Sequence, residues 1–139
     1  MVNRVLVDTS FLVALNNPRD RNYAVTRQFA ADSKYLYLIP DVVLTETAYL
    51  LKKAGGLPLV MRFLDRLNNL NPALVAVQNQ DLKRTREIMA QYTAANLDFV
   101  DCCLMALSER LSIDSVCTFD HRDFVIFQPK HTLYLTLLP

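Results

Sequence analysis

The amino-acid sequence predicts one α/β sandwich built on a mostly parallel sheet. Short apolar runs typical of strands alternate along the chain with longer segments whose apolar residues recur at helical spacing. Such alternation is typical of parallel sheets covered by helices. The 139 residues, 52% of them apolar and 21% charged, are enough for one hydrophobic core. Since no repeat, linker or low-complexity stretch divides the chain, we expect residues 1–139 to form a single domain.

The first predicted elements are a strand and a helix separated by a polar corner. Residues 5–7 are apolar and are followed by the run Asp8-Thr9-Ser10. Residues 11–15 then show helical spacing, which the run Asn16-Asn17-Pro18 ends. We therefore expect a short strand, a corner and a helix in this order.

A second helix and a second strand are expected next. Residues 23–31 place Val25 and Phe29 at helical spacing. Residues 35–39 form an apolar run with β-strand character, which Pro40 ends. The pairing of strands with helices therefore continues along the chain.

A longer amphipathic helix follows Pro40. Asp41 is a suitable N-cap, and apolar residues continue at helical spacing as far as Leu51. Lys52 and Lys53 fall in the last turn, where cations interact favourably with the helix dipole. Gly55 is the expected left-handed residue that ends this helix.

The second half of the chain repeats the alternation. Pro58 suits the first turn of an amphipathic helix that reaches Leu67. The elements expected after it are a strand over 74–77, a helix over 82–92, a strongly apolar helix over 99–111 and a strand over 115–119. The tail over 125–137 is rich in strand-forming residues, so we expect strand there.

The counts of glycine, histidine and cysteine exclude several classes of protein. The two glycines are adjacent, at Gly55 and Gly56, so neither a G-x-G-x-x-G turn nor a Walker A loop is present. Two histidines and three cysteines occur without an H-E-x-x-H or C-x-x-C arrangement, which excludes the usual zinc sites. A bound metal would therefore have oxygen ligands. The formal net charge of +1 provides no overall basic field for nucleic acid.

Cysteine usage and hydropathy indicate a cytoplasmic protein. Cys102, Cys103 and Cys117 are an odd-numbered set with apolar neighbours, as is typical of reduced core thiols. The longest apolar runs are far shorter than the roughly 18 residues that a membrane-spanning helix needs. The polar corner at residues 8–10 interrupts what would be the core of a signal peptide. We expect a mature N-terminal strand and no membrane partner.

Four carboxylates occupy positions where a binding site is expected. Asp8 and Asp120 directly follow predicted strands, and open α/β sheets bind ligands beyond the carboxyl ends of their strands. Glu46 lies within an apolar helical stretch, and Asp101 begins the hydrophobic helix. Acids are rarely buried without a partner, so these four positions together favour a functional site.

Each acid taken alone also has a structural interpretation. Asp98 or Asp101 would serve as an N-cap or a first-turn acid of the helix that follows. Asp8 and Asp120 would cap the helices after their strands. Glu46 would lie on a solvated stripe of its helix. Each of these interpretations explains one residue, but none explains why four acids together occupy positions where a binding site is expected.

Convergence of the four acids would create strong repulsion. Two carboxylates about 4 Å apart repel by roughly 4 kcal/mol at an effective dielectric constant of about 20. A divalent cation removes this repulsion, and oxygen ligands suit Mg²⁺ or Mn²⁺. Such ions activate water and stabilise a leaving oxygen at phosphorus. From the residues alone, we predict a metal-dependent phosphoesterase of unspecified substrate.

Four motifs carry a resemblance to a known family. They are VLVDTS at Val5–Ser10, LTET at Leu44–Thr47, LDFVD at Leu97–Asp101 and CTFDHRDF at Cys117–Phe124. In this order and at this spacing, they resemble the PIN domain over essentially the whole chain. Among PIN domains, they look most like the VapC toxin-type ribonucleases.

The resemblance implies a three-layer α/β/α sandwich with an acidic pocket that binds Mg²⁺ or Mn²⁺ and cleaves RNA. The positions that match the catalytic and metal-binding acids of the family are Asp8, Glu46, Asp101 and Asp120. The residues expected to support these acids or position the substrate are Ser10, Thr9, Thr118, Asp98 and Asp123. The candidate RNA contacts are Lys52 and Arg122.

The resemblance also implies protein partners. A toxin of this type is held in check by a small antitoxin, so the expected protein is the endoribonuclease of a type II toxin–antitoxin pair. Family members usually form dimers, and the apolar helices after Gly56 offer a surface for a homodimer.

The main alternative is a catalytically silent PIN-like module that binds RNA or protein. The intact set of four acids disfavours it. A receiver-type phosphoacceptor domain would need an adjacent acidic pair after the first strand, and that pair is not present. A haloacid-dehalogenase-like phosphatase would need a second Asp two residues after Asp8, where Ser10 stands.

Overall fold

Five parallel strands form one sheet at the centre of the protein. The computed structural model describes residues 3–70 and 72–139. Within these residues the strand order is β3-β2-β1-β4-β5, and each neighbouring pair is parallel. The strands are β1 (Arg4–Val7), β2 (Leu36–Pro40), β3 (Ala73–Val75), β4 (Ser115–Cys117) and β5 (Thr136–Leu138). The predicted α/β class is confirmed.

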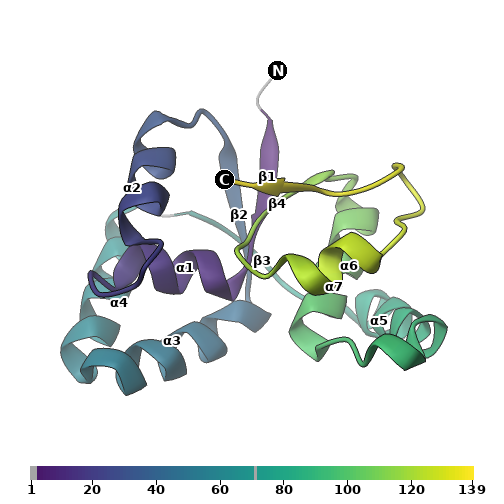
Figure 1. The fold of residues 1–139 in the computed structure, drawn as a ribbon, viewed down its shortest axis with the longest axis horizontal. Coiled ribbons are helices and arrows are strands. Elements are labelled where there is room, and N and C mark those ends of the chain that lie inside the picture. The colour runs from purple at the N-terminus through teal and green to yellow at the C-terminus, as the bar shows by residue number, and fades with distance from the viewer. Residues whose placement is uncertain (1–2, 71) are drawn as a thin grey trace.

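Helices cover both faces of this sheet. They are α1 (Thr9–Asn16), α2 (Tyr23–Asp32), α3 (Val42–Gly55), α4 (Leu57–Leu70), α5 (Asn79–Gln91), the 3₁₀ turn η1 (Thr93–Ala95), α6 (Phe99–Leu111) and α7 (His121–Ile126). Figure 1 shows α1 to α4 on one side of the strands and α5 to α7 on the other. The protein is therefore a three-layer α/β/α sandwich.

The core is centred on β1 and α6. The residues Val5, Leu6 and Val7 of β1 are buried, because β1 lies between β2 and β4 and has helices on both faces. In α6, residues 101–108 are all buried. A helix that is buried around its whole circumference needs the nearly uninterrupted apolar sequence that α6 has.

Helix α3 begins and ends differently from the prediction. Asp41 has a helical backbone conformation and does not cap α3 with its side chain. Its Oδ1 instead accepts a hydrogen bond of 3.2 Å from the Val77 backbone N–H, on the segment that follows β3. Gly55 is the last residue of α3, and Gly56 has the left-handed φ of 74°. A glycine has no Cβ, so either Gly55 or Gly56 could adopt a left-handed φ. The sequence alone therefore did not decide which of the two ends the helix.

The prediction of strand over 125–137 is wrong for most of that tail. Helix α7 extends to Ile126, and the segment Thr136–Leu138 pairs with β4. Phe124 and Phe127 are fully buried, so their packing against the core fixes the course of the chain. This tertiary packing overrides the local strand preference of the β-branched residues in the segment.

Two short strands end earlier than predicted. Strand β3 covers Ala73–Val75 instead of 74–77, and strand β4 ends at Cys117 instead of at residue 119. The Thr118 backbone N–H still donates to the Leu138 carbonyl of β5, but its hydroxyl donates to Asp8 and the Phe119 N–H donates to Ser10 of α1. These contacts direct the chain after β4 toward the carboxyl end of β1.

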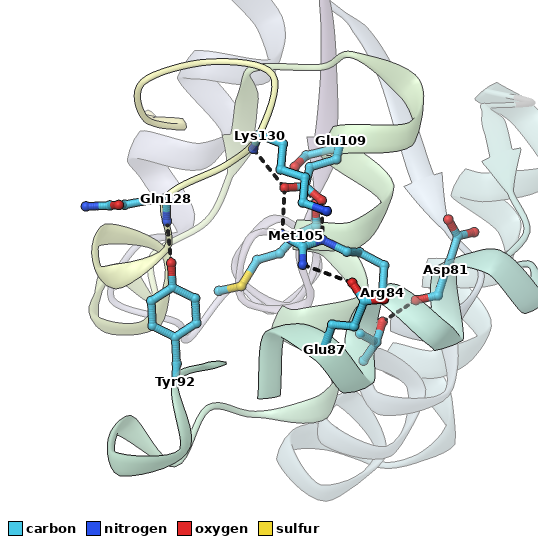
Figure 2. A network of polar contacts seen from close by, with 10 residues as sticks. Asp81, Arg84, Glu87, Tyr92, Met105, Glu109, Gln128 and Lys130 are labelled. Atoms are coloured by element: carbon cyan, nitrogen blue, oxygen red, sulfur yellow. Dashed lines mark hydrogen bonds and ion pairs between the residues drawn. The ribbon is translucent and has the colours of Figure 1, made fainter. Parts of the chain in front are cut away.

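An ion-pair network joins the helices on one side of the sheet to the C-terminal tail. Figure 2 shows the Arg84 guanidinium of α5 against the Glu109 carboxylate of α6, with nitrogen–oxygen distances of 2.6 and 3.1 Å. The same carboxylate accepts a hydrogen bond of 2.8 Å from the Lys130 backbone N–H. The Tyr92 hydroxyl accepts one of 3.0 Å from the Gln128 backbone N–H. These contacts hold the tail between α7 and β5 in place.

The structure describes the state of the cysteines and the character of the helices. All three cysteines are unpaired and buried. In the part of the chain that the structure describes, no helix combines the length and the apolar character needed to cross a membrane.

Candidate active site

Asp8 lies at the carboxyl end of the central strand. Its backbone N–H extends the β1–β4 pairing by donating to the Cys117 carbonyl at 3.0 Å. One carboxylate oxygen, Oδ1, accepts a hydrogen bond of 2.8 Å from the Thr9 N–H and so caps α1. The other, Oδ2, accepts a hydrogen bond of 2.7 Å from the Thr118 hydroxyl. Asp8 is only 3% exposed, so its carboxylate has a fixed direction.

Two hydroxyl groups connect Asp8 to the loop after β4. The Ser10 and Thr118 hydroxyls are 3.2 Å apart. The Phe119 N–H donates to the Ser10 oxygen at 2.9 Å, and the Asp120 N–H donates to the Thr118 oxygen at 3.0 Å. The Ser10 and Thr118 hydroxyls therefore join the loop after β4 to the Asp8 carboxylate. Thr9 takes part through its backbone N–H instead, and its hydroxyl oxygen is buried without a hydrogen-bond partner among the described residues.

Asp101 enters the site from the first turn of α6. Asp98 caps this helix, because its Oδ1 accepts a hydrogen bond of 2.7 Å from the Val100 N–H. Asp101 follows one turn later and is 4% exposed. Its Oδ2 is buried and has no hydrogen-bond partner within the residues that the structure describes. A buried carboxylate oxygen without a donor is costly, and a bound cation is one way to satisfy it.

Asp123 links α7 to the start of α6. Its carboxyl group is buried close to the Asp101 carboxyl group and helps to raise the pKa of Asp101. Its Oδ2 also accepts a hydrogen bond of 3.2 Å from the Asp98 backbone N–H. Asp98 and Asp123 therefore have structural contacts that position the amino end of α6, whatever further role they have.

Glu46 and Asp120 are more open to solvent than the two buried acids. Glu46 is half-buried on α3, and Asp120 is exposed just before α7. The charges of both raise the pKa of Asp8, which shows that the fold brings them near that carboxylate. The four predicted acids thus come from β1, α3, α6 and the segment before α7, and they gather at the carboxyl end of the sheet.

Burial and mutual repulsion strongly raise the pKa values of the two buried acids, Asp8 and Asp101. Burial raises the pKa of Asp8 to about 6, although hydrogen bonds from Thr118 and Thr9 act in the opposite direction. Burial raises the pKa of Asp101 to about 9, and the charge of Asp8 is the second cause. Acidic residues that have strongly shifted pKa values and lie close together are typical of functional sites. The protein keeps these charges together at a cost that a cation would offset.

The residues present fit a hard divalent cation. All the ligand atoms on offer are carboxylate or hydroxyl oxygens, and one oxygen of Asp101 has no protein donor. Within residues 3–70 and 72–139, no group of three or more His, Cys, Asp or Glu side chains is arranged to hold a metal ion. A site in this arrangement would therefore use fewer than three of these acids, and Mg²⁺ usually binds proteins through one or two carboxylates and keeps several waters.

The two predicted RNA contacts lie at the surface on different elements. Lys52 is exposed in the last turn of α3. Arg122 is exposed on α7, and its Nη2 donates a hydrogen bond of 2.7 Å to the Ala95 carbonyl. Its Nε is 3.9 Å from the Asp123 carboxylate, so Arg122 is partly engaged within the protein.

Tyr49 follows Glu46 by three residues on α3 and is exposed, although the amphipathic pattern of this helix counts it among the apolar residues. The three-residue spacing from an acid of the site is the signal in the sequence that marks it.

The fold and the acidic centre together define the class of the protein. It is an α/β/α sandwich with a parallel sheet whose carboxyl edge gathers acidic side chains from both helical layers. The family model of the PIN domain matches residues 5–127, and the chain therefore belongs to the PIN domain family. No curated protein matches the chain.

Solved structures with the same fold include several VapC toxins. VapC20 from Mycobacterium tuberculosis, described as a sarcin-ricin loop cleaving toxin, has a TM-score of 0.81 and 21% identity, covering 92% of this chain and 98% of its own. VapBC2 from Rickettsia felis, bound to a promoter DNA fragment, has a TM-score of 0.67 and 14% identity, covering 96% of each chain. FitAcB from Neisseria gonorrhoeae has a TM-score of 0.67 and 12% identity, covering 97% and 96%. These likenesses establish the fold.

Proposed function

We propose that the protein is a metal-dependent endoribonuclease and the toxin of a type II toxin–antitoxin pair. The observation that carries this proposal is the pair of buried acids, Asp8 and Asp101, which belong to different elements and repel one another at the carboxyl edge of the sheet. A fold that keeps such charges together without a basic neighbour is suited to binding a cation. Membership of the PIN domain family agrees with nuclease chemistry.

The choice of RNA as substrate is supported by a structural neighbour. VapC20 from Mycobacterium tuberculosis is named as a toxin that cleaves the sarcin-ricin loop. The fold of VapC20 matches the fold of the present chain over nearly the whole length of both. We therefore propose RNA phosphodiester bonds as the substrate, with Lys52 and Arg122 contacting the RNA backbone.

The proposed ligands of Mg²⁺ or Mn²⁺ are the acids Asp8, Glu46, Asp101 and Asp120. When bound, the ion would activate water and stabilise the leaving oxygen. The Thr118 and Ser10 hydroxyls hold the Asp8 carboxylate in one orientation, and Thr9 directs its second oxygen through a backbone N–H. Asp98 and Asp123 fix the first turn of α6, so that Asp101 faces the same centre.

We propose two protein partners, an antitoxin and a second copy of the chain. The antitoxin is supported by the solved neighbours, several of which are toxin–antitoxin complexes. The homodimer is supported by Leu57, Met61 and Leu64, which are exposed apolar residues at helical spacing along α4. A protein that sediments as a monomer at high concentration would rule out the homodimer.

We further propose that residues 1–139 work as one domain in the cytoplasm. The family model spans residues 5–127, from β1 to the residue after α7, without a break. Three buried, unpaired cysteines suit a reducing compartment.

The decisive experiment is cleavage of a mixed cellular RNA pool by the purified protein. Reactions containing Mg²⁺, Mn²⁺ or EDTA are compared for the parent protein and the Asp101→Asn variant. We expect discrete cuts that require metal and disappear in the variant. Cuts that persist in EDTA or in the variant would remove the proposed site. Metal binding without any cleavage would instead favour the catalytically silent binding module.

A further inference from the structure

We propose that one face of α3 binds single-stranded RNA next to the acidic site, with Tyr49 stacking on an unpaired nucleobase and Lys53 contacting a phosphate. The inference rests on the proposed ribonuclease function and extends it to the substrate strand. The observations that carry it are helix geometry, the exposure of Tyr49 and the charge of Lys53.

Helix geometry places three chemically different residues along one line. Glu46, Tyr49 and Lys53 belong to α3, which runs without interruption over Val42–Gly55. Separations of three and seven residues return to nearly the same side of an α-helix. At a rise of 1.5 Å per residue, Tyr49 lies about 4.5 Å and Lys53 about 10.5 Å from Glu46 along the axis. A strand leaving the acidic site along α3 would meet the ring first and the ammonium group second.

Tyr49 is an aromatic residue with no role in the core. It is 64% exposed, and within the described residues it makes no aromatic, cation–π or side-chain hydrogen-bond contact. The other tyrosines near the sheet behave differently, since Tyr35 and Tyr37 stack on phenylalanine rings. An exposed ring beside a phosphodiesterase centre is the feature that proteins use to stack unpaired bases.

Lys53 supplies the positive charge that the acidic site lacks. It is exposed, and none of the ion pairs in the described residues includes it. The four acids would repel the flanking phosphates of a substrate strand, so a nearby cation on the strand's path favours binding. Lys52 is adjacent in sequence but is turned about 100° around the helix, so the backbone contact proposed for it lies beside the line of Glu46, Tyr49 and Lys53 and not on it.

The proposal concerns a single strand because stacking needs a base that is not paired. Base–aromatic stacking tolerates any sequence, and the phosphate contact is equally sequence-independent. The α3 face would therefore contribute affinity and strand conformation, while it leaves base identity to other parts of the site.

The test measures binding of a fluorescein-labelled single-stranded RNA of mixed sequence, with Mg²⁺ present, in an Asp101→Asn background that does not cleave. We expect Tyr49→Ala to raise the Kd about tenfold and Tyr49→Phe to leave it nearly unchanged, because the phenyl ring still stacks. Neither change should alter the melting temperature, because the ring is exposed in the free protein.

The salt dependence of the same binding isolates the phosphate contact. Lys53→Gln is expected to reduce the slope of log Kd against log salt by about 0.7, the value for one phosphate contact on a single strand. The matched control is Lys34→Gln, an exposed lysine before β2 at the opposite end of the sheet, which should leave the slope unchanged.

The outcomes separate this inference from the proposed function. If the parent protein makes no metal-dependent cuts in RNA, the ribonuclease proposal itself fails, and if the parent cleaves RNA but the Asp101→Asn background binds none, the α3 face does not bind a strand by itself. If it binds RNA and Tyr49→Ala binds equally well, the α3 face is not a strand-binding site. A Tyr49→Ala variant with unchanged RNA affinity but altered sedimentation would assign the ring to a protein interface and overturn the inference.

Discussion

At the scale of single residues, the site depends on the surroundings of two buried carboxylates, those of Asp8 and Asp101. Asp8 accepts hydrogen bonds from the Thr9 N–H and from the Thr118 and Ser10 hydroxyls, and those from Thr118 and Thr9 counteract part of the effect of burial on its pKa. Among the described residues, Asp101 has a carboxylate oxygen without a donor, and burial raises its pKa to about 9. The carboxylate of Asp8 is therefore oriented by the protein, whereas the charged form of Asp101 lacks such support from the described residues.

The first prediction concerns Asp101 and the pH dependence of stability without metal. Because burial raises the pKa of Asp101 above its value in the unfolded chain, the folded state loses stability as pH rises from about 4 to about 9. Asp101→Asn removes this loss, so in EDTA at pH 8 it should be more stable than the parent by about 1–3 kcal/mol. Thermal melts at pH 5 and pH 8 measure the effect. Parallel pH profiles for the two proteins would contradict it.

The second prediction concerns the Thr118 hydroxyl. Thr118→Val removes the donor to Asp8 and leaves the Asp120 N–H without its acceptor, which should destabilise the protein by about 1–3 kcal/mol. Since this hydrogen bond lowers the pKa of Asp8, the acidic limb of the cleavage profile should move to higher pH. Thr118→Ser keeps the hydroxyl and is expected to retain the parent profile. A Val variant with an unshifted limb would remove Thr118 from the site.

At the scale of elements, the site is assembled from four segments that are each fixed outside it. Helix α6 is fixed by its buried apolar residues, and the segment between α7 and β5 is fixed by the network in Figure 2. Burial alone raises the pKa of Glu109, but hydrogen bonds from Arg84 and the Lys130 N–H outweigh it, so the pKa of Glu109 is lowered. The pair therefore stabilises the joint between α5, α6 and the tail at neutral pH.

The third prediction concerns this joint. Arg84→Met leaves the half-buried Glu109 carboxylate without its ion pair and should destabilise the protein by about 1–3 kcal/mol at pH 7. Because the pKa of Glu109 is lowered in the folded protein, the loss should be full above the ordinary pKa of a glutamate and should shrink as the pH falls through the lowered folded-state pKa. Hydrogen exchange should quicken at the Lys130 amide.

The matched control for Arg84→Met is Glu87→Ala. Glu87 also pairs with Arg84, at 3.3 Å, but its side chain is largely exposed. Exposed pairs at this spacing contribute about 0.5 kcal/mol or less, so this variant should melt nearly as the parent does. Equal destabilisation by the two changes would show that the Glu109 pair has no special role.

At the scale of the whole molecule, local charge matters more than total charge. The formal net charge is +1, yet six acids lie at one edge of the sheet: Asp8, Glu46, Asp98, Asp101, Asp120 and Asp123. They come from both helical layers, so the sheet and its two layers must be in place before the charges meet. Cation binding should therefore stabilise the folded protein as a unit.

The fourth prediction is that Mg²⁺ or Mn²⁺ raises the melting temperature of the parent at pH 8. An ion at 100 times its Kd adds about 2.7 kcal/mol to the free energy of unfolding. The shift should be lost in Asp8→Asn and in Asp101→Asn. It should be kept in Asp65→Asn, which changes an exposed acid of α4 away from the acidic site. A shift of equal size in all four proteins would mean that the ion binds elsewhere.

The sequence by itself determined the fold class, the positions of most elements and the four candidate acids. These features depend on local patterns, since an apolar run such as Val5–Val7 or a helix such as α6 is specified by its own residues. The order of strands and helices then directs Asp8 to the carboxyl end of a parallel strand. The structure confirms the α/β/α sandwich, and the roles of the acids stay a proposal.

Only the tertiary structure decided how the C-terminal tail folds and how the acids interact. The segment after Asp120 forms α7 because Phe124 and Phe127 pack into the core. The local preferences of the residues do not encode this packing. The influence of Asp123 on the pKa of Asp101 joins residues from two helices, and the contact of Asp41 with Val77 joins the segments that follow two strands. Burial, and with it the pKa of a carboxylate, depends on neighbours that are distant in sequence, so the chain must fold before these properties exist.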